Sequence, residues 1–324
     1  MKNTQKDKHK HFLLDDVCGQ LQAKRALTIA VAGRHNILLN GPPGTGKSML
    51  AKCIPSLLPD MSLQECIEVT KIHSLVRQTT QAITERPFRT PHHSASLSAM
   101  LGGGAQSLPG EVSLAHNGVL YLDEFAEYPR SILESLRQPL EDRQISISRA
   151  NAKTTYPANI MLVATTNPCP CGYYKSPDHV CSCSPAQLAA YQKKLSGPLL
   201  DRIDITFTVN RPPESVLFKN TTISTHEHAN AKNLIQTALN NQFNRYQNPA
   251  KFNSMLSSHE VATLISLTKP AENLLRLASK SQGLSARAFF RTIKVARTIA
   301  DLESAPEVDE AHVAEALAYR QVID

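Results

Sequence analysis

The sequence has no tryptophan, no apolar run of 18 residues and no signal-like N-terminus. Without such a run, no segment is long and apolar enough to cross a bilayer as a helix. Residues 1–11 are rich in Lys, His and Gln, so we expect no secretory signal there. We therefore expect a soluble cytoplasmic protein with no membrane partner, while the absence of tryptophan excludes nothing.

Internal repeats and low-complexity blocks are also missing beyond the basic N-terminal residues. What is present is a chain of 324 residues with 41% hydrophobic content, which is enough for two domains with buried cores. The net charge of +7 and the pI near 9.0 permit a polyanionic partner without requiring one.

A glycine-rich segment at residues 41–48, GPPGTGKS, is the most informative feature. The apolar run 36–40 before it predicts a buried strand, and the residues after it predict a helix. Between a strand and a helix, the pattern G-x-x-x-x-G-K-S/T is a phosphate loop whose backbone N–H groups surround an anion. Lys47 would then reach the β- and γ-phosphates, and the Ser48 hydroxyl would bind Mg²⁺. The sequence thus predicts an ATP and Mg²⁺ site formed by Gly41, Pro42, Pro43, Gly44, Thr45, Gly46, Lys47, Ser48 and Met49.

An apolar strand that ends in two carboxylates is predicted at residues 118–124, GVLYLDE. The carboxyl ends of parallel strands share one edge of a sheet, so this pair should lie beside the phosphate loop. Asp123 would hold Mg²⁺ through water, and Glu124 would polarise the water that attacks the γ-phosphate. A strand that merely runs into an acidic turn is the simpler alternative, but the preceding phosphate loop favours the catalytic interpretation.

A third apolar run, 160–166, ends at Asn167. An amide at a strand tip beside the acidic pair could orient water and sense the γ-phosphate. Asn is also an ordinary turn former. Its chemistry alone leaves these two interpretations open.

The organisation of the chain indicates two domains. Short apolar runs alternate with helical patterns over residues 15–210, which predicts an α/β fold with a parallel sheet. The prolines at 212 and 213 break the chain and only helical periodicities follow, so we place a boundary near residue 211. Residues 211–324 are predicted to be a small helical domain, with Ser285 and Asp309 as helix N-caps. Residues 1–14 are predicted to be a disordered basic tail.

The order of these motifs resembles that of an AAA+ ATPase, a P-loop parallel-sheet sandwich followed by a small all-α lid domain. The series continues with LLDRID at 199–204 and LSAR at 284–287. Three further stretches resemble the magnesium-chelatase-like branch of these ATPases, and within it the YifB/ComM family. They are RPFRTPHH at 86–93, PGEVSLAHNG at 109–118 and NPCPCG at 167–172. The resemblance covers about residues 12–324.

The resemblance implies roles for two arginines. Arg202 would be the arginine finger that reaches a neighbouring subunit's nucleotide, and Arg287 would be the second sensor arginine on the lid. These roles imply a ring, usually a hexamer. Without the resemblance, Arg202 would be read as a salt-bridge partner of Asp201 or Asp204, and Arg287 as part of a solvated helix face.

The start of the resembling region carries two further expectations. Val17 and Gly19 precede the first predicted helix at the place where such ATPases bind adenine through backbone contacts, although this segment could also be a simple helix entry. Members of the family carry a Lon-like domain ahead of the ATPase, whereas only residues 1–14 precede Asp15 here. A natural short form and a fragment both fit that difference.

Four of the seven cysteines lie close together in the segment 168–185. Two Cys-x-Cys pairs could close a tetrahedral site on a structural Zn²⁺ ion. Reduced thiols in a flexible insertion are the alternative. The zinc ligands predicted in this way are Cys169, Cys171, Cys181 and Cys183.

Two insertions bear on the substrate. Residues 144–156 alternate like a hairpin whose tip carries Arg149 and Lys153, and the Gly-, Pro- and His-rich residues 86–110 are predicted to be a mobile loop. In the resembling ATPases both elements project toward the central pore. Basic side chains there would grip a DNA backbone without reading its sequence. Solvated turn charges are the alternative.

Three functional classes follow. The first is a ring-forming ATPase motor that translocates on DNA, such as a branch-migration helicase. The second is a protein remodeller or a chelatase-type assembly subunit. The third is a scaffold that binds ATP without turning it over, and Glu124 and Arg202 argue against it because a binder needs neither. The DNA motor is our preferred prediction.

Overall fold

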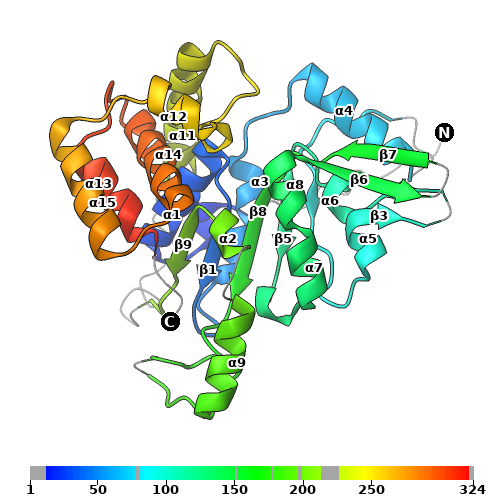
Figure 1. The fold of residues 1–324 in the computed structure, drawn as a ribbon, viewed down its shortest axis with the longest axis horizontal. Helices are drawn as coiled ribbons and strands as arrows, with labels where there is room; N and C mark the ends of the chain where they lie inside the picture. The colour runs from blue at the N-terminus through cyan, green and yellow to red at the C-terminus, as the bar shows by residue number, and fades with distance from the viewer. Residues whose placement is uncertain are drawn as a thin grey trace.

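The computed structural model of this chain describes residues 12–76, 81–104, 106–149, 152–176, 178–195, 199–212 and 226–320, without the side chains of residues 148, 149, 152 and 153. A parallel five-stranded sheet lies at the centre of the molecule (Figure 1). Its strands follow the spatial order β2 (Phe88–Arg89), β5 (Val119–Leu122), β8 (Met161–Thr166), β1 (Ile37–Asn40) and β9 (Ile205–Thr208). The expected α/β class with a parallel sheet is confirmed.

The three predicted apolar strands are β1, β5 and β8, and they lie next to one another. Every residue of these strands is buried, as expected where helices cover both faces of a parallel sheet. Their side chains alternate between two cores, so that Ile37 and Leu39 enter one core and Leu38 enters the other. Their carboxyl ends share one edge of the sheet.

Short helices surround the sheet in the first two thirds of the chain. The core that contains Leu38 also receives residues of α5, α6, α7 and α9, and the opposite core receives α1 and α3. These elements are η1 (Leu14–Asp16), α1 (Leu21–Gly33), α2 (Lys47–Lys52), α3 (Ile54–Leu57), α4 (Leu63–Ser74), α5 (Leu97–Leu101), α6 (Glu111–Leu114), η2 (Phe125–Glu127), α7 (Arg130–Ser135), α8 (Arg137–Asp142), α9 (Pro185–Leu195) and η3 (Leu200–Arg202).

The described residues after 226 form a helical lid. The predicted N-caps are observed, since Ser285 Oγ accepts a hydrogen bond from the N–H of Ala288 at 3.2 Å and Asp309 caps in the same way. These helices share one hydrophobic core with α1 and the sheet instead of forming a separate core. The lid consists of α11 (Glu227–Tyr246), η4 (Asn253–Met255), α12 (Ser258–Leu264), α13 (Lys269–Ser281), α14 (Ala286–Leu302) and α15 (Glu310–Ala318).

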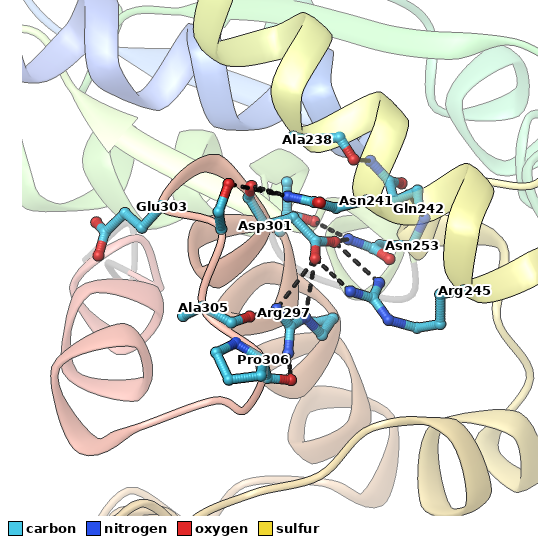
Figure 2. A network of polar contacts seen from close by, with 12 residues as sticks. Ala238, Asn241, Gln242, Arg245, Asn253, Arg297, Asp301, Glu303, Ala305 and Pro306 are labelled. Carbon is cyan, nitrogen blue, oxygen red and sulfur yellow. Dashed lines mark hydrogen bonds and ion pairs between the residues drawn. The ribbon is translucent and has the colours of Figure 1, made fainter.

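A buried polar network centred on Asp301 holds the lid together (Figure 2). Asp301 is 0% exposed and Arg297 is 1% exposed. The Asp301 carboxylate accepts hydrogen bonds from Arg297 Nε at 3.2 Å, Arg245 Nη1 at 3.0 Å and Asn253 Nδ2 at 2.8 Å. Arg297 also donates to the carbonyl of Pro306 at 2.9 Å. The network therefore joins α11, η4, α14 and the turn before α15.

The hairpin predicted at 144–156 is confirmed as the antiparallel pair β6 (Gln144–Arg149) and β7 (Ala152–Pro157). Arg149 and Lys153 belong to its strands, and their side chains lie outside the described part of the chain. The prediction that residues 86–110 form a loop is wrong in part, because the segment contains a short helix and short strands; whether it is mobile stays a prediction. These elements are β2, α5 and the antiparallel strands β3 (Gly102–Gly103) and β4 (Leu108–Pro109). Met100 anchors this segment because it is fully buried in the core that contains Leu38.

Most of the predicted tail, residues 1–11, lies outside the described residues, as do residues 213–225 beyond the predicted domain boundary. Leu14, at the end of that tail, is 1% exposed and packs in the core. Among the described helices, none combines the length and the apolar character that crossing a membrane requires.

Candidate functional site

The phosphate-loop segment connects β1 to α2. Gly44 and Gly46 have φ angles of +77° and +89°, a region that side chains other than glycine rarely adopt. Gly46 is the N-cap of α2, so Lys47 and Ser48 open the helix. The glycine spacing in the sequence is thus what lets the backbone turn from the strand directly into the helix.

The ammonium group of Lys47 is buried against oxygen atoms. Its Nζ donates to the carbonyls of Gly41 at 2.6 Å and Pro42 at 2.7 Å, and to Asn167 Oδ1 at 3.2 Å. Burial lowers the pKa of Lys47 to about 8, and the charges of Asp123 and Glu124 offset that effect only in part. A phosphate group at this position would stabilise the charged ammonium form.

The hydroxyl groups of Ser48 and Thr165 meet at the carboxylate of Asp123. The Ser48 hydroxyl lies 3.4 Å from Asp123 Oδ1, and the Thr165 hydroxyl donates to the same oxygen at 2.5 Å. Hydroxyl and carboxylate oxygens are the ligands that Mg²⁺ prefers, so this donor set fits the predicted metal. Thr165 was not among the predicted site residues, although it lies only two residues before Asn167 at the tip of β8.

A cavity of about 380 Å³ brings most of the predicted site together. Glu124 follows β5 in a left-handed conformation, with φ of 52°, and its N–H donates to Thr165 Oγ1 at 3.3 Å. The volume is in the range of small-ligand sites. The cavity is lined by residues 43–49, Asp123, Glu124, Thr165, Thr166 and Asn167.

Val17 and Gly19 are not among the residues that line this cavity. Val17 is 5% exposed, and its carbonyl accepts a hydrogen bond from Lys24 Nζ at 2.6 Å. Gln20 connects the same segment to the phosphate loop by donating to the carbonyl of Thr45 at 3.2 Å. The segment therefore lies beside the loop, and its contact with adenine remains a prediction.

Arg202 and Arg287 lie at the opposite edge of the sheet. Asn36 immediately precedes β1, whereas the phosphate loop follows it, and Asn36 Nδ2 donates to the carbonyl of Arg202 at 2.8 Å. Both arginines form ion pairs with Glu141, at 2.8 Å for Arg202. They line a cavity of about 630 Å³ that shares no residue with the cavity at the phosphate loop. The contact of Glu141 with these arginines could not be predicted from the sequence, because Glu141 is one of many acidic residues in helices.

The four predicted zinc ligands converge. Their sulfur atoms all lie within 4.8 Å of one another, and all four are free thiols in the structure. Cys169 is fully buried, while the other three are partly exposed. The donor set fits one tetrahedral Zn²⁺ ion.

A parallel sheet with a phosphate loop after β1, an acidic pair after β5 and a helical lid defines the AAA+ fold. Residues 13–217 match the family model for magnesium chelatase subunit ChlI, and residues 225–320 match the model for the C-terminal region of that subunit. The chain therefore belongs to the magnesium chelatase ChlI family, and the predicted resemblance is confirmed.

Individual relatives refine this assignment. The chain is 47% identical over 311 residues to the uncharacterized protein YifB of Escherichia coli, and 45% identical over 312 residues to the competence protein ComM of Haemophilus influenzae. These matches cover 95% and 96% of this chain, and the chain spans about 60% of the length of both relatives. A more distant match, 29% identical over 183 residues, is the DNA replication licensing factor mcm7 of Schizosaccharomyces pombe, with 56% of this chain and 20% of that protein covered.

Proposed function

We propose that this chain hydrolyses ATP as part of a ring-forming AAA+ motor that acts on DNA in the cytoplasm. The observation that carries this proposal is the convergence of five side chains on one cavity: Lys47, Ser48, Asp123, Glu124 and Asn167. A protein that only holds a nucleotide needs little more than the phosphate loop. The acidic pair and the amide are the additions that hydrolysis requires.

Each residue has a separate role in the proposed reaction. The Lys47 ammonium binds the β- and γ-phosphates together with the backbone of the phosphate loop. Ser48 and Asp123 would hold Mg²⁺, which supplies positive charge to the phosphate oxygens. The Glu124 carboxylate polarises the attacking water, and the Asn167 amide orients that water toward the γ-phosphate.

The position of the two arginines supports the proposed ring. Negative charge gathers on the transferred oxygens during hydrolysis, and a guanidinium group stabilises it through paired hydrogen bonds. Because Arg202 and Arg287 lie at the far edge of the sheet from their own phosphate loop, we propose that both serve the nucleotide of a neighbouring subunit in a hexamer.

DNA is the proposed substrate for four reasons. The net charge is +7, one relative is named a competence protein and another a DNA replication licensing factor. The β6–β7 hairpin also carries the basic residues Arg149 and Lys153 close to its turn. Contacts between basic side chains and phosphates bind DNA without sequence preference and weaken steeply with salt.

The test measures ATP turnover with and without forked DNA at two salt concentrations, together with the native mass. We expect DNA to stimulate turnover several-fold at low salt and less at high salt. The double variant Arg149→Ala/Lys153→Ala should lose this stimulation. Lys269→Ala/Arg276→Ala is a matched control that removes the same charge from an exposed face of α13. Turnover that is indifferent to DNA would favour protein remodelling or chelatase-type assembly instead.

Two variants test the ATP site itself. Lys47→Ala should bind fluorescent ATP very weakly or not at all, because the phosphates lose their main cationic partner. Glu124→Gln should bind ATP normally and hydrolyse it very slowly. Ordinary turnover by the Glu124→Gln variant would remove Glu124 from its proposed role.

A further inference from the structure

The cysteine cluster has the dimensions of a metal centre. Sulfur–sulfur distances are 3.3 Å for Cys169 and Cys171, 3.8 Å for Cys169 and Cys181, and 3.5 Å for Cys171 and Cys181. Four thiolates at zinc–sulfur distances of about 2.3 Å form a tetrahedron with edges of about 3.8 Å. A disulfide would need about 2.05 Å between two sulfurs. The spacing therefore fits one tetrahedral ion and not a pair of disulfides.

Backbone N–H groups point at the same sulfurs. The N–H of Tyr174 donates to Cys169 Sγ at 3.2 Å, and the N–H of Cys171 donates to Cys183 Sγ at 3.4 Å. Hydrogen bonds of this kind orient metal ligands and partly neutralise thiolate charge. The cluster thus has the supporting contacts of a built site as well as its ligands.

Both ends of the cysteine loop return to the tip of β8. Cys169 comes two residues after Asn167, whose Oδ1 accepts a hydrogen bond from Lys47. At the other end, α9 begins two residues after Cys183, and the hydroxyl of its Tyr191 lies 3.3 Å from Thr166 Oγ1. The cluster is therefore built onto the strand end that lines the nucleotide cavity.

Gly172, directly after the first Cys-x-Cys pair, lies against Pro43 of the phosphate loop. Gly172 has φ of +87°, and a Cβ atom added there would lie 2.5 Å from Cδ of Pro43. Only a glycine lets the backbone of this loop approach the Pro43 ring this closely. Between β8 and α9 the described residues form no helix or strand. The N–H of Gly172 donates to the carbonyl of Cys169 at 2.9 Å, so the position of Gly172 is tied directly to a cysteine of the cluster.

We propose that one Zn²⁺ ion bound by the four cysteines holds this loop against Pro43 and fixes Asn167 beside Lys47. The coupling rests on the ATP site proposed above, whereas the metal centre does not. Because metal binding and local folding are linked, loss of the ion disorders the loop and removes support from both sides of the nucleotide cavity. The cysteines are positioning residues in this scheme, and none of them touches ATP.

Elemental analysis of the purified chain tests the metal centre without any activity measurement. We expect close to one equivalent of zinc, and loss of most of it in Cys181→Ser. Cys66→Ser is the matched control, because Cys66 lies on α4 away from the cluster and should leave the zinc content unchanged. Less than about half an equivalent of zinc in the parent chain, or iron in its place, would overturn the proposal.

Titration with fluorescent ATP tests the coupling. Cys181→Ser should bind ATP about tenfold more weakly than the parent, and Cys66→Ser should bind equally well. Zinc loss without a change in ATP affinity would overturn the coupling. A parent chain that holds zinc but binds no nucleotide would instead overturn the proposed ATP site and leave the zinc centre standing.

Gly172→Ala keeps all four cysteine ligands, so it tests the coupling between the loop and the ATP site even if Cys181→Ser fails to fold. It should retain its zinc and bind ATP about fivefold more weakly or worse, because the added methyl group displaces Pro43 and strains the backbone. Gly283→Ala is its control, since Gly283 also has positive φ, at +60°, but lies in the lid with no atom within 4 Å of the added carbon. Unchanged ATP affinity in Gly172→Ala would contradict the proposal.

Discussion

Arg287 of α14 lies beside Arg202 of η3, because both guanidinium groups bind the carboxylate of Glu141. Arg202 is held further by a hydrogen bond from its Nε to the carbonyl of Arg137 at 3.2 Å. These contacts fix both arginines on one subunit surface, at the amino edge of the sheet. Two residues that are distant in sequence therefore form one basic pair.

Subunit mixing tests whether this pair serves a neighbour. Arg202→Ala and Glu124→Gln should each be inactive alone but regain ATP turnover when mixed, because the second variant lends its arginine to the intact cavity of the first. Arg202→Ala mixed with Arg287→Ala should stay inactive, since every cavity would lack one arginine. Recovered turnover in that second mixture would mean that Arg287 acts on its own subunit's nucleotide.

Thr165→Val should weaken the apparent affinity for Mg²⁺ that is measured from ATP turnover. The change keeps the shape of a side chain that is 1% exposed but removes the hydroxyl that donates to Asp123. A hydrogen bond to a charged group contributes about 1.5–3 kcal/mol, so the Mg²⁺ midpoint should rise roughly ten- to hundredfold. Thr165→Ser keeps the hydroxyl and should stay close to the parent. An unchanged midpoint in the valine variant would remove Thr165 from the metal site.

The affinity for ATP should fall as the pH rises through the pKa of Lys47, which is about 8 in the nucleotide-free chain. Bound phosphate favours the ammonium form and raises that pKa, so the dissociation constant should be flat below it and rise by up to about tenfold per pH unit above it. Fluorescent-ATP titrations between about pH 6.5 and 9.5 would measure this. Lys47→Arg keeps its charge throughout that range and should give a flat profile. A rise of equal size in the arginine variant would exclude Lys47 as the titrating group.

Asp301→Ala should destabilise the chain by about 3–5 kcal/mol, because it leaves the buried charge of Arg297 and the partly buried charge of Arg245 without their shared partner. Urea unfolding followed by circular dichroism would measure the loss. Glu272→Ala is the control, since it removes an acidic residue from an exposed ion pair on α13 and should cost less than about 1 kcal/mol. A loss for Asp301→Ala as small as that of the control would show that the network contributes little to folding.

The parts of the fold that the sequence predicted are those encoded locally. The runs that became β1, β5 and β8 are continuously apolar because both faces of the sheet are covered. Ser285 and Asp309 cap helices through contacts within three residues. The grouping of Lys47 with Asp123 was also predictable, because parallel strands bring their carboxyl ends to one edge.

The parts that could not be predicted depend on distant contacts. Glu141 became important only because α8, η3 and α14 meet around it. The Gly- and Pro-rich composition of residues 86–110 concealed a segment that Met100 anchors in the core. The contact between Gly172 and Pro43 likewise joins two loops that are far apart in the chain, and neither sequence indicates that they meet.

The single core that α1, the sheet and the lid have in common limits how this protein can change shape. Ile293, Val295 and Ile299 of α14 are at most 4% exposed within that core. Because α14 packs on α1, moving it away would expose part of this shared core to water, at a cost of about 1.5–3 kcal/mol for each large apolar side chain that becomes fully exposed. We therefore expect the lid to resist opening within one chain. In the ring proposed above, a movement driven by ATP would then fall between neighbouring protomers.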